Sequence, residues 1–392
     1  MEIRGAYLSS PHRRFTLTIM HIDADNKRFQ DFIEETEKKL DMEITVEKCP
    51  SNADNRQAKI STILASGDKN IDLISVNDEM ISEFKHKGYL EPLEKNVMTE
   101  EVRDSFPQKY LESICEENGH IYSVPFQMDI MMFWVNQELL KQAGLDEIKN
   151  TGDFDILQKS LKNPDQYAYG DAWENTHVYN SLSQFVNFWG GDYFDWTDPK
   201  TKDAARYMKS MLDEKNTSPA QFVDQYEQME EKFIRGKYGC VFMYTSALGT
   251  FLDADVYGKN KIHMAPLPVL HKKKATNIAT WQYVLNNASE NKDAAVRFLQ
   301  YAAGYEGSTE YAKIMKSYPA RVDVIENEDI DLEGIDMIRK YLREYTLNAR
   351  PLCENSMGAV SDMGKLFQGY VLGQCEEDSF FEQAQNCINT YY

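Results

Sequence analysis

The stretch Phe15-Thr16-Leu17-Thr18-Ile19-Met20 begins the series of elements that decides the fold class. Apolar and polar side chains alternate along it, and this period of two residues predicts a β-strand. Residues 26–40 then place Phe29, Phe32 and Ile33 at helical spacing among charged residues. That pattern predicts an amphipathic helix directly after the strand.

The same alternation of elements continues for another forty residues. Residues 43–47 and 71–76 predict two further strands, and residues 55–65 between them predict a second helix that ends at Gly67. Strands that alternate with helices at this spacing form a parallel sheet with right-handed crossovers. The chain is therefore predicted to be an α/β protein.

Ligands of open parallel sheets bind beyond the carboxyl ends of the strands. The segments that leave those ends are residues 21–25, 50–54 and 77–79, and all three are polar. Some of these side chains are expected to cap the following helices, since Asp and Asn are preferred at that position. The residues that we select here as candidate ligand contacts are His21, Asp23, Asn77 and Asp78.

The pattern changes near residue 128. Gly119-His120-Ile121-Tyr122-Ser123-Val124-Pro125-Phe126 reads as one extended run and residues 130–135 as another. The polar triplet Gln127-Met128-Asp129 between them is typical of a crossing between two lobes, so Gln127 and Asp129 join the candidate contacts. We find no low-complexity linker, which predicts interwoven lobes.

Size and charge exclude several classes of protein. A chain of 392 residues is too long for one hydrophobic core, so about two domains are expected. The formal net charge of −20 disfavours nucleic-acid binding. No apolar run approaches the roughly 18 residues of a membrane-spanning helix. The six cysteines are widely spread and lack metal-site spacing, so they are interpreted as free thiols.

Motifs for catalysis and for cofactors are nearly absent. The sequence contains no GxGxxG, GxxxxGK[ST], HExxH or GxSxG. We therefore expect no cofactor, no metal and no enzymatic activity. Its 63 acidic residues nevertheless leave open a pair of carboxylates of the kind that cleaves glycosidic bonds.

Several short pieces, taken in order, resemble the solute-binding proteins of bacterial carbohydrate ABC importers, the broad family of maltose-binding protein. The pieces are His21-Ile22-Asp23, Ile63-Leu64-Ala65-Ser66-Gly67-Asp68, Ile71-Asp72-Leu73-Ile74, Lys87-Gly88-Tyr89-Leu90-Glu91-Pro92-Leu93, the extended run from Gly119, Trp134-Val135-Asn136, Ala143-Gly144-Leu145, Trp189-Gly190-Gly191-Asp192, Phe233-Ile234-Arg235-Gly236-Lys237, Ala265-Pro266-Leu267-Pro268 and Pro319-Ala320-Arg321. Each piece alone is weak, but their order extends from about residue 15 to the C-terminus.

The resemblance implies two α/β lobes of the periplasmic-binding-protein type (type II), which close over a ligand between them. We place the N-terminal lobe at residues 1–128 and 269–320, and the C-terminal lobe at residues 129–268 and 321–392. The resemblance further implies a monomeric lipoprotein outside the cell that delivers its ligand to an ABC permease. Residues 1–14 have no apolar signal region, and no lipobox is present, so export rests on the resemblance alone.

A sugar site needs aromatic faces for the C–H surfaces of the ring and planar polar groups for its hydroxyls. The candidate aromatic platforms are Trp173, Trp189, Tyr244 and Trp281, each with burial in a lobe core as its alternative. Trp281 stands where the family often has a small residue. Trp173 and Trp281 could hold one pyranose ring between the lobes. Arg321 is a further candidate, with an interlobe ion pair as its alternative.

The sequence thus predicts a protein that binds a sugar or oligosaccharide. Two alternatives remain open at this point. One is a different solute: an acid-rich cleft around Asp23, Asp78 and Asp129 would favour a polyamine or another cation, several arginines would favour an organic anion, and a peptide is also possible. The other is a carbohydrate-active enzyme.

Overall fold

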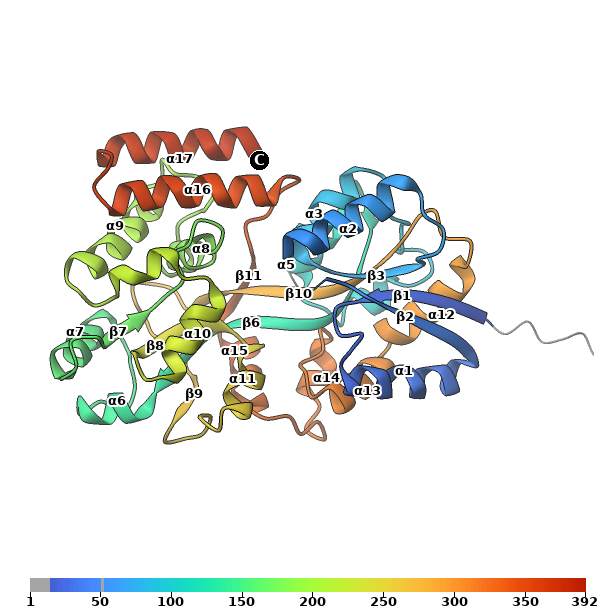
Figure 1. Cartoon of the computed structure of the whole chain (residues 1–392), viewed down its shortest axis with the longest axis horizontal. Coiled ribbons are helices and arrows are strands. Elements are labelled where there is room, and N and C mark those ends of the chain that lie inside the picture. The colour runs from blue at the N-terminus through green and yellow to red at the C-terminus, as the bar shows by residue number, and fades with distance from the viewer. Residues whose placement is uncertain (1–14, 51–52) are drawn as a thin grey trace, which may run out of the picture.

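The computed structural model describes residues 15–50 and 53–392. The predictions for residues 1–14, and for Ser51 and Asn52 of the second polar segment, lie outside this part of the chain. The described residues form two lobes, side by side in Figure 1. We call the lobe that carries the N-terminal strands the first lobe, and the lobe that carries the C-terminal helices the second lobe.

The strands are short except for two that extend across both lobes. They are β1 (Phe15–His21), β2 (Met42–Lys48), β3 (Leu73–Asn77), β4 (Glu116–Glu117), β5 (His120–Ile121), β6 (Val124–Asn136), β7 (Tyr167–Gly170), β8 (Tyr238–Tyr244), β9 (Ile262–Ala265), β10 (Ala275–Leu285) and β11 (Thr346–Ala349).

The helices cover both faces of the sheet. They are α1 (Lys27–Leu40), α2 (Ala53–Ser66), α3 (Asp78–His86), α4 (Glu100–Arg103), α5 (Gln108–Tyr110), the π-helical turn η1 (Leu111–Cys115), α6 (Gln137–Gln142), α7 (Thr151–Ser160), α8 (Val178–Trp189), α9 (Pro199–Asp213), the 3₁₀ turn η2 (Pro219–Val223), α10 (Tyr226–Ile234), α11 (Ala247–Asp253), α12 (Lys292–Ala303), α13 (Tyr305–Met315), α14 (Val322–Glu326), α15 (Ile335–Glu344), α16 (Ser356–Val371) and α17 (Glu377–Tyr391).

The predicted α/β series at the N-terminus is confirmed. β1 pairs in parallel with β2 on one side and with β3 on the other, and α1 and α2 are the crossover helices. Asn26 caps α1, because its side chain accepts a hydrogen bond from the Arg28 amide. Within the described residues the main sheet has the order β2-β1-β3-β10-β6-β8-β7, with β11 beside β10 and β9 beside β6.

The structure corrects the prediction of a break at residues 127–129. β6 is one continuous strand, and its first half pairs with β10 while its second half pairs with β8 and β9. The polar residues stay in the strand because partners satisfy them: the Tyr311 hydroxyl donates to Gln127, and the Thr245 hydroxyl donates to Asp129. The crossing between the lobes is therefore part of the sheet.

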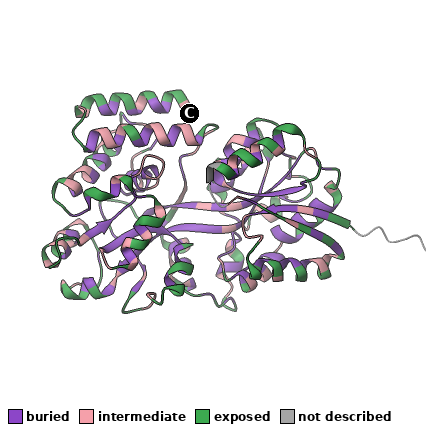
Figure 2. Cartoon of the chain, in the orientation of Figure 1, coloured by how far each residue is buried: buried purple, intermediate pink, exposed green. Residues whose placement is uncertain are grey.

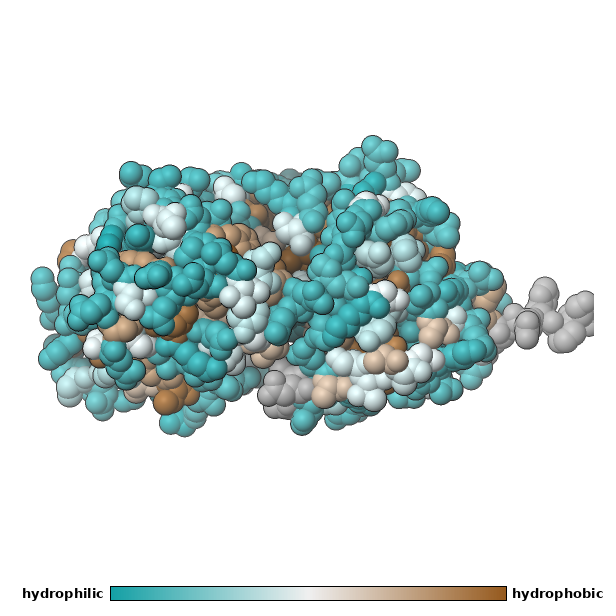
Figure 3. Space-filling view, turned by 90° about the horizontal axis from the view of Figure 1, so that it is seen from above, coloured by the Kyte–Doolittle hydropathy of each residue, from teal (hydrophilic) through white to brown (hydrophobic). Residues whose placement is uncertain are grey.

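Figure 2 shows buried residues along nearly the whole of β6 and β10, and this burial joins the cores of the two lobes. The face seen in Figure 3 is mostly hydrophilic, with hydrophobic residues in small scattered groups. All six cysteines lie in the described part and are free. Among the described residues, no helix is long and apolar enough to cross a membrane.

Helix α16 packs closely on the segment before α8. A Cβ at Gly364 would lie 1.9 Å from the Asn175 carbonyl oxygen, whereas a Cβ at Gly369 on the same helix would meet nothing within 4 Å. The absence of a side chain at Gly364 is therefore what lets α16 rest on this segment.

We predict that Gly364→Ala lowers the free energy of unfolding by about 1–3 kcal/mol, because the backbone must move to relieve the clash. Gly369→Ala is the matched control and should raise the same free energy by about 0.4–1 kcal/mol, since alanine restricts the unfolded chain. Urea denaturation measures both. Equal effects of the two substitutions would contradict the close approach.

Candidate functional site

A cavity of about 640 Å³ lies between the two lobes, which is within the usual range for small-molecule sites. Both lobes and both long strands contribute to its wall. The lining residues are Ile22, Asp23, Asn26, Arg28, Gln127, Met128, Thr245, Ser246, Leu248, Gly249, Leu252, Trp281, Met315, Lys316, Ser317, Tyr318, Asp331, Leu332 and Glu333.

Trp281 supplies the indole of the cavity wall. It lies in β10 opposite Asn77 of β3 and Gln127 of β6, next to a shift in register between β10 and β6. Bulges of this kind redirect side chains beside binding sites. The Arg56 guanidinium covers the Trp281 ring at 5.4 Å from its centroid, and the indole remains partly exposed. The ring is thus held in place by a cation–π contact while part of it is accessible.

The neighbouring residues of β10 alternate between the two faces of the strand. Thr280 and Gln282 are buried on the opposite face, where both hydrogen bond with the Tyr110 hydroxyl. Tyr283 lies on the same face as Trp281 and stacks on Phe126 at 4.3 Å between ring centroids. On this face of β10, Trp281 therefore lines the cavity and Tyr283 does not.

Gln127 and Asp23 place polar groups in the wall beside Trp281. The Gln127 side-chain oxygen accepts a hydrogen bond from Tyr311, so its amide nitrogen is directed away from that contact. Asp23 follows β1 and is half-buried, and burial raises the pKa of its carboxyl. Both residues can exchange hydrogen bonds with a polar solute.

The second lobe presents Thr245 and Ser246, which follow β8 and precede α11. Asp129 holds this turn from behind, because its carboxylate accepts from the Thr245 hydroxyl at 2.6 Å and from the Ser246 amide at 2.9 Å. Burial raises the pKa of Asp129, and these two hydrogen bonds offset part of that effect. Asp129 therefore positions the wall and does not itself line the cavity.

The charged side chains of the wall nearly balance. Asp23, Asp331 and Glu333 provide three carboxylates, and Arg28 and Lys316 provide two cations. The cavity wall therefore has a formal net charge of −1, with both signs present. A neutral polar solute fits this balance better than a polyamine or an organic anion.

A buried cluster of charges joins the lobes beyond the cavity. Arg350, which follows β11, donates to Asp78 and to Glu79 at the start of α3, with 2.7 Å between its Nη1 and the Glu79 Oε1. Tyr179 of α8 donates to the same Glu79 oxygen at 2.6 Å. Burial alone would raise the pKa of Glu79, but Arg350 and Tyr179 hold it below its ordinary value. The cluster therefore ties the first lobe to the second through ionised groups.

Known proteins share this two-lobed arrangement. The family model for the bacterial extracellular solute-binding protein matches residues 23–309, well over half of the chain. The chain belongs to this family. A probable amino-acid ABC transporter periplasmic-binding protein of Sinorhizobium fredii is 24% identical over 239 residues, which are 58% of this chain. Those residues are 54% of that protein, so the match spans about half the length of this relative.

Solved structures of solute-binding proteins have the same fold over nearly the whole chain. An ABC transporter solute-binding protein of Thermotoga lettingae, bound with α-D-tagatose, has a TM-score of 0.80 at 19% identity and covers 96% of this chain and 99% of its own. The GacH receptor of Streptomyces glaucescens, solved unliganded and with acarbose, has a TM-score of 0.79 at 18% identity and covers 97% and 100%. At these identities the likeness shows the fold.

Two of the aromatic platforms expected in this solute-binding protein belong to the core. Trp173 is fully buried in the second lobe, where its indole donates to Asp171 at 2.8 Å and meets Phe222 and Phe367 edge to face. Trp189 is also buried, stacked on His271. Neither indole lines the interlobe cavity, so the predicted sandwich of Trp173 and Trp281 is wrong.

Four polar candidates are also bound to protein partners and do not line the cavity. Asn77 caps α3 by accepting from the Met80 amide, and Asp78 is fully buried in the ion cluster. The Arg321 guanidinium donates to Asp323, to the Ser105 hydroxyl and to the Ala303 carbonyl. His21 is buried against Phe29.

Tyr244 lies at the end of β8 and is buried. Its hydroxyl donates to Asn180 at 2.9 Å, and its ring lies 5.9 Å from the Arg350 guanidinium. It therefore supports the ion cluster and does not line the cavity. Of the candidate contacts, Asp23, Gln127 and Trp281 line the cavity.

Sequence reasoning missed most of the wall, including two of its polar parts. Thr245 and Ser246 directly follow strand β8, and the rule that polar residues after a strand mark a site would have selected them in the second lobe as well. The segment 331–333 carries no such signal, because its acidic residues resemble any solvated loop. Among the described residues, no group of three or more His, Cys, Asp or Glu side chains could hold a metal ion.

His21 generates a prediction for the pH dependence of stability. Its ring is fully buried and stacks on Phe29 at 3.8 Å, and burial lowers its pKa to about 3. The unfolded chain binds a proton near pH 6.5 that the folded chain does not bind, so stability must fall as the pH falls below that value.

We compare the free energy of unfolding of the wild type with that of His21→Phe. As the pH is lowered from about 5.5 to about 3.5, the wild type should lose about 1.4 kcal/mol per pH unit relative to the variant. Urea titrations at several pH values measure the difference and cancel the pH dependence of all other groups. Parallel curves for the two proteins would show that His21 titrates normally in the folded state.

The ion cluster generates a second prediction for stability. Arg350→Met leaves the buried Asp78 and the half-buried Glu79 without their cation, which should lower the free energy of unfolding by about 3–5 kcal/mol. Arg343→Met is the control, since Arg343 pairs with Glu326 while 59% exposed. The control should lose much less in the same urea denaturation. Similar losses in both variants would contradict a buried charge network.

Proposed function

We propose that this solute-binding protein captures a sugar or an oligosaccharide in the cavity between its lobes and delivers it to the permease of an ABC importer, without catalysing a reaction. The observation that carries the proposal is Trp281. It is a partly exposed indole, held from one side by Arg56, in a wall that also offers hydroxyl groups, amide groups and charged groups of both signs.

This combination matches the chemistry of a sugar. The C–H surface of a pyranose ring packs on an aromatic face, and its hydroxyls both donate and accept hydrogen bonds. Asp23, Gln127, Thr245 and Ser246 surround Trp281 with groups of these kinds. The near balance of charge supports a neutral solute over the polyamine and the organic anion.

The proposal includes closure of the lobes over the solute. The walls belong to different lobes, and the connections between them are few strands and loops, which is the arrangement of a hinge. The partner is expected to be the membrane permease, and the protein a monomer held outside the cell as a lipoprotein. These points rest on the family.

A different solute is a second candidate, because the Sinorhizobium relative is described as an amino-acid binding protein. Amino acids carry an ammonium and a carboxylate, and the wall carries both Asp23 and Arg28 as possible partners. The test must therefore include amino acids and peptides beside sugars.

A thermal-shift screen tests the proposal. The compounds are gluco-, xylo-, manno-, galacto- and fructo-oligosaccharides, the monosaccharides, amino acids, short peptides, polyamines and organic anions. A ligand at 100 times its dissociation constant adds about 2.7 kcal/mol to the stability of the folded state. We expect at least one neutral sugar to raise the melting temperature, and a response only to the other classes would reject the carbohydrate proposal.

Trp281→Ala should weaken the binding of that sugar by about 2 kcal/mol, roughly 30-fold, in isothermal titration calorimetry, and should leave the fold stable. Trp173→Ala is the matched control and should cost about 3–5 kcal/mol of stability with unchanged affinity in the folded fraction. Incubation with the bound oligosaccharide should produce no new reducing ends. Their appearance would indicate an enzyme.

A further inference from the structure

A second cavity, of about 740 Å³, lies against the second lobe and shares a wall with the first. The shared wall is the segment Asp331-Leu332-Glu333, which lines both cavities. This segment belongs to the connection between α14 and α15, at the bottom of the view in Figure 1. The two cavities are therefore neighbours, separated by this one segment.

The connection is held in place at several points. Ile330 and Leu332 are buried, and the Arg339 guanidinium donates to the carbonyls of Asn327 and Ile330. On the other side, the Tyr318 hydroxyl donates to the Glu333 carbonyl. Because the backbone is anchored in this way, the exposed side chains of Asp331 and Glu333 have a defined place at the border of the cavities.

Two tyrosine hydroxyls lie close to Gly334, the residue that follows this border. A Cβ at Gly334, which has φ +73°, would lie 3.2 Å from the Tyr318 hydroxyl oxygen and 3.3 Å from that of Tyr257. Tyr318 lines the first cavity and Tyr257 the second. Gly334 thus leaves room for one phenol from each cavity and for the Met264 methyl group, which a Cβ would approach to 2.9 Å.

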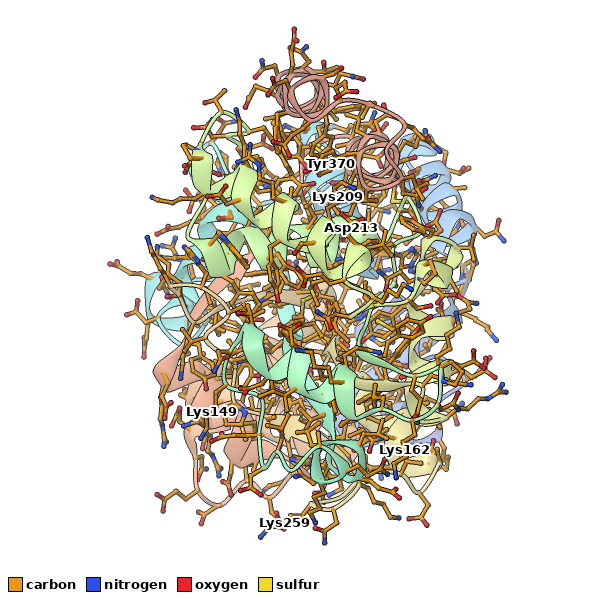
Figure 4. All side chains as sticks on the ribbon, turned by 90° about the vertical axis from the view of Figure 1, so that its left-hand side faces the viewer. Lys149, Lys162, Lys209, Asp213, Lys259 and Tyr370 are labelled. Atoms are coloured by element: carbon orange, nitrogen blue, oxygen red, sulfur yellow. The ribbon has the colours of Figure 1, made fainter. Side chains whose placement is uncertain are left out.

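The second cavity offers the same kinds of group as the first. Tyr257 and His263 are half-buried in its wall, with a phenol and an imidazole that can contact a sugar face or exchange hydrogen bonds. Lys259 is exposed at its rim and labelled near the lower edge of Figure 4. Its wall also carries four carboxylates (Glu328, Asp331, Glu333 and Asp336) and two cations (Lys259 and Arg339), and these groups can exchange hydrogen bonds with the hydroxyls of a polar ligand.

We propose that the solute is a chain of several sugar units that begins at Trp281, crosses the border formed by Asp331 and Glu333, and places its further units in the second cavity. This inference rests on the proposed function and names its substrate class, an oligosaccharide longer than a disaccharide. A monosaccharide or disaccharide fills the first cavity and leaves the second to solvent.

Calorimetric titration with a chain-length series tests the inference. The probes are the disaccharide, tetrasaccharide and hexasaccharide of whichever linkage raises the melting temperature in the thermal-shift screen. We expect the affinity to increase at least tenfold from the disaccharide to the longer chains. His263→Ala should remove most of this increase and leave the disaccharide affinity unchanged.

Because His263 is half-buried, a second variant at an exposed position is needed. Lys259→Ala should leave the fold intact and should lower the affinity for the long chain by a smaller factor than His263→Ala does. Lys162→Ala is the control. It is exposed on the same lobe, is also labelled in Figure 4, and lines neither cavity, so it should change neither affinity. Hydrogen exchange gives an independent readout, since residues 257–264 should gain protection with the hexasaccharide and not with the disaccharide.

Each outcome decides the question. Equal affinity for all chain lengths, with no difference in protection of residues 257–264, would confine the solute to the first cavity and overturn the inference while the proposed function stands. If no sugar of any length binds, the proposed function fails and the inference fails with it.

Discussion

The antiparallel pairing of β6 with β10 is the constraint on which the two lobes depend. Hydrogen bonds join the strands from Val124 with Tyr283 to Ile130 with Ile278, and each strand then continues into the sheet of the second lobe. The lobes are therefore connected through a continuous sheet and not through loops alone. Relative motion of the lobes must twist or bend these strands, which limits it to a few directions.

This constraint also places the cavity. Gln127 and Trp281 are directly opposite each other in the β6–β10 pair, so the floor of the cavity is built on the same residues that join the lobes. The two side walls, at Asp23 and at Ser246, belong to different lobes. A solute that contacts the floor and both walls is stabilised more by a closed arrangement than by an open one, and this differential contact is what can drive closure.

The charged groups near the cavity have two roles: some hold the two lobes and the cavity wall in place, and others line the cavity. Asp78 and Arg350 are buried and Glu79 is half-buried; Arg350 joins both carboxylates across the two lobes, and Asp129 is bonded to the Thr245–Ser246 turn. Burial of such groups is tolerated only when each has a partner, and here the partners belong to different elements and hold them in register. The charges left in the cavity wall nearly cancel. Recognition by hydroxyl and aromatic contacts, and not by net charge, is consistent with this division.

The sequence alone determined the α/β class, the parallel strands at the N-terminus with their two crossover helices, and the family. These follow from periodicity and from short motifs, because a strand or an amphipathic helix is specified by residues close together in the chain. The alternation along β10 likewise suffices to place Trp281 and Tyr283 on one face of that strand.

Only the tertiary structure decided which polar and aromatic residues face the cavity. Trp173 and Trp281 have the same chemistry, but Trp173 is enclosed by Phe222 and Phe367, which are far apart in the chain, and Trp281 is not enclosed. Asp78 and Asp23 both follow strands, but only Asp23 lines the cavity. Asp78 is buried in an ion pair with Arg350, which is about 270 residues away in the chain. Burial and pairing depend on such distant neighbours, and local sequence carries no record of them.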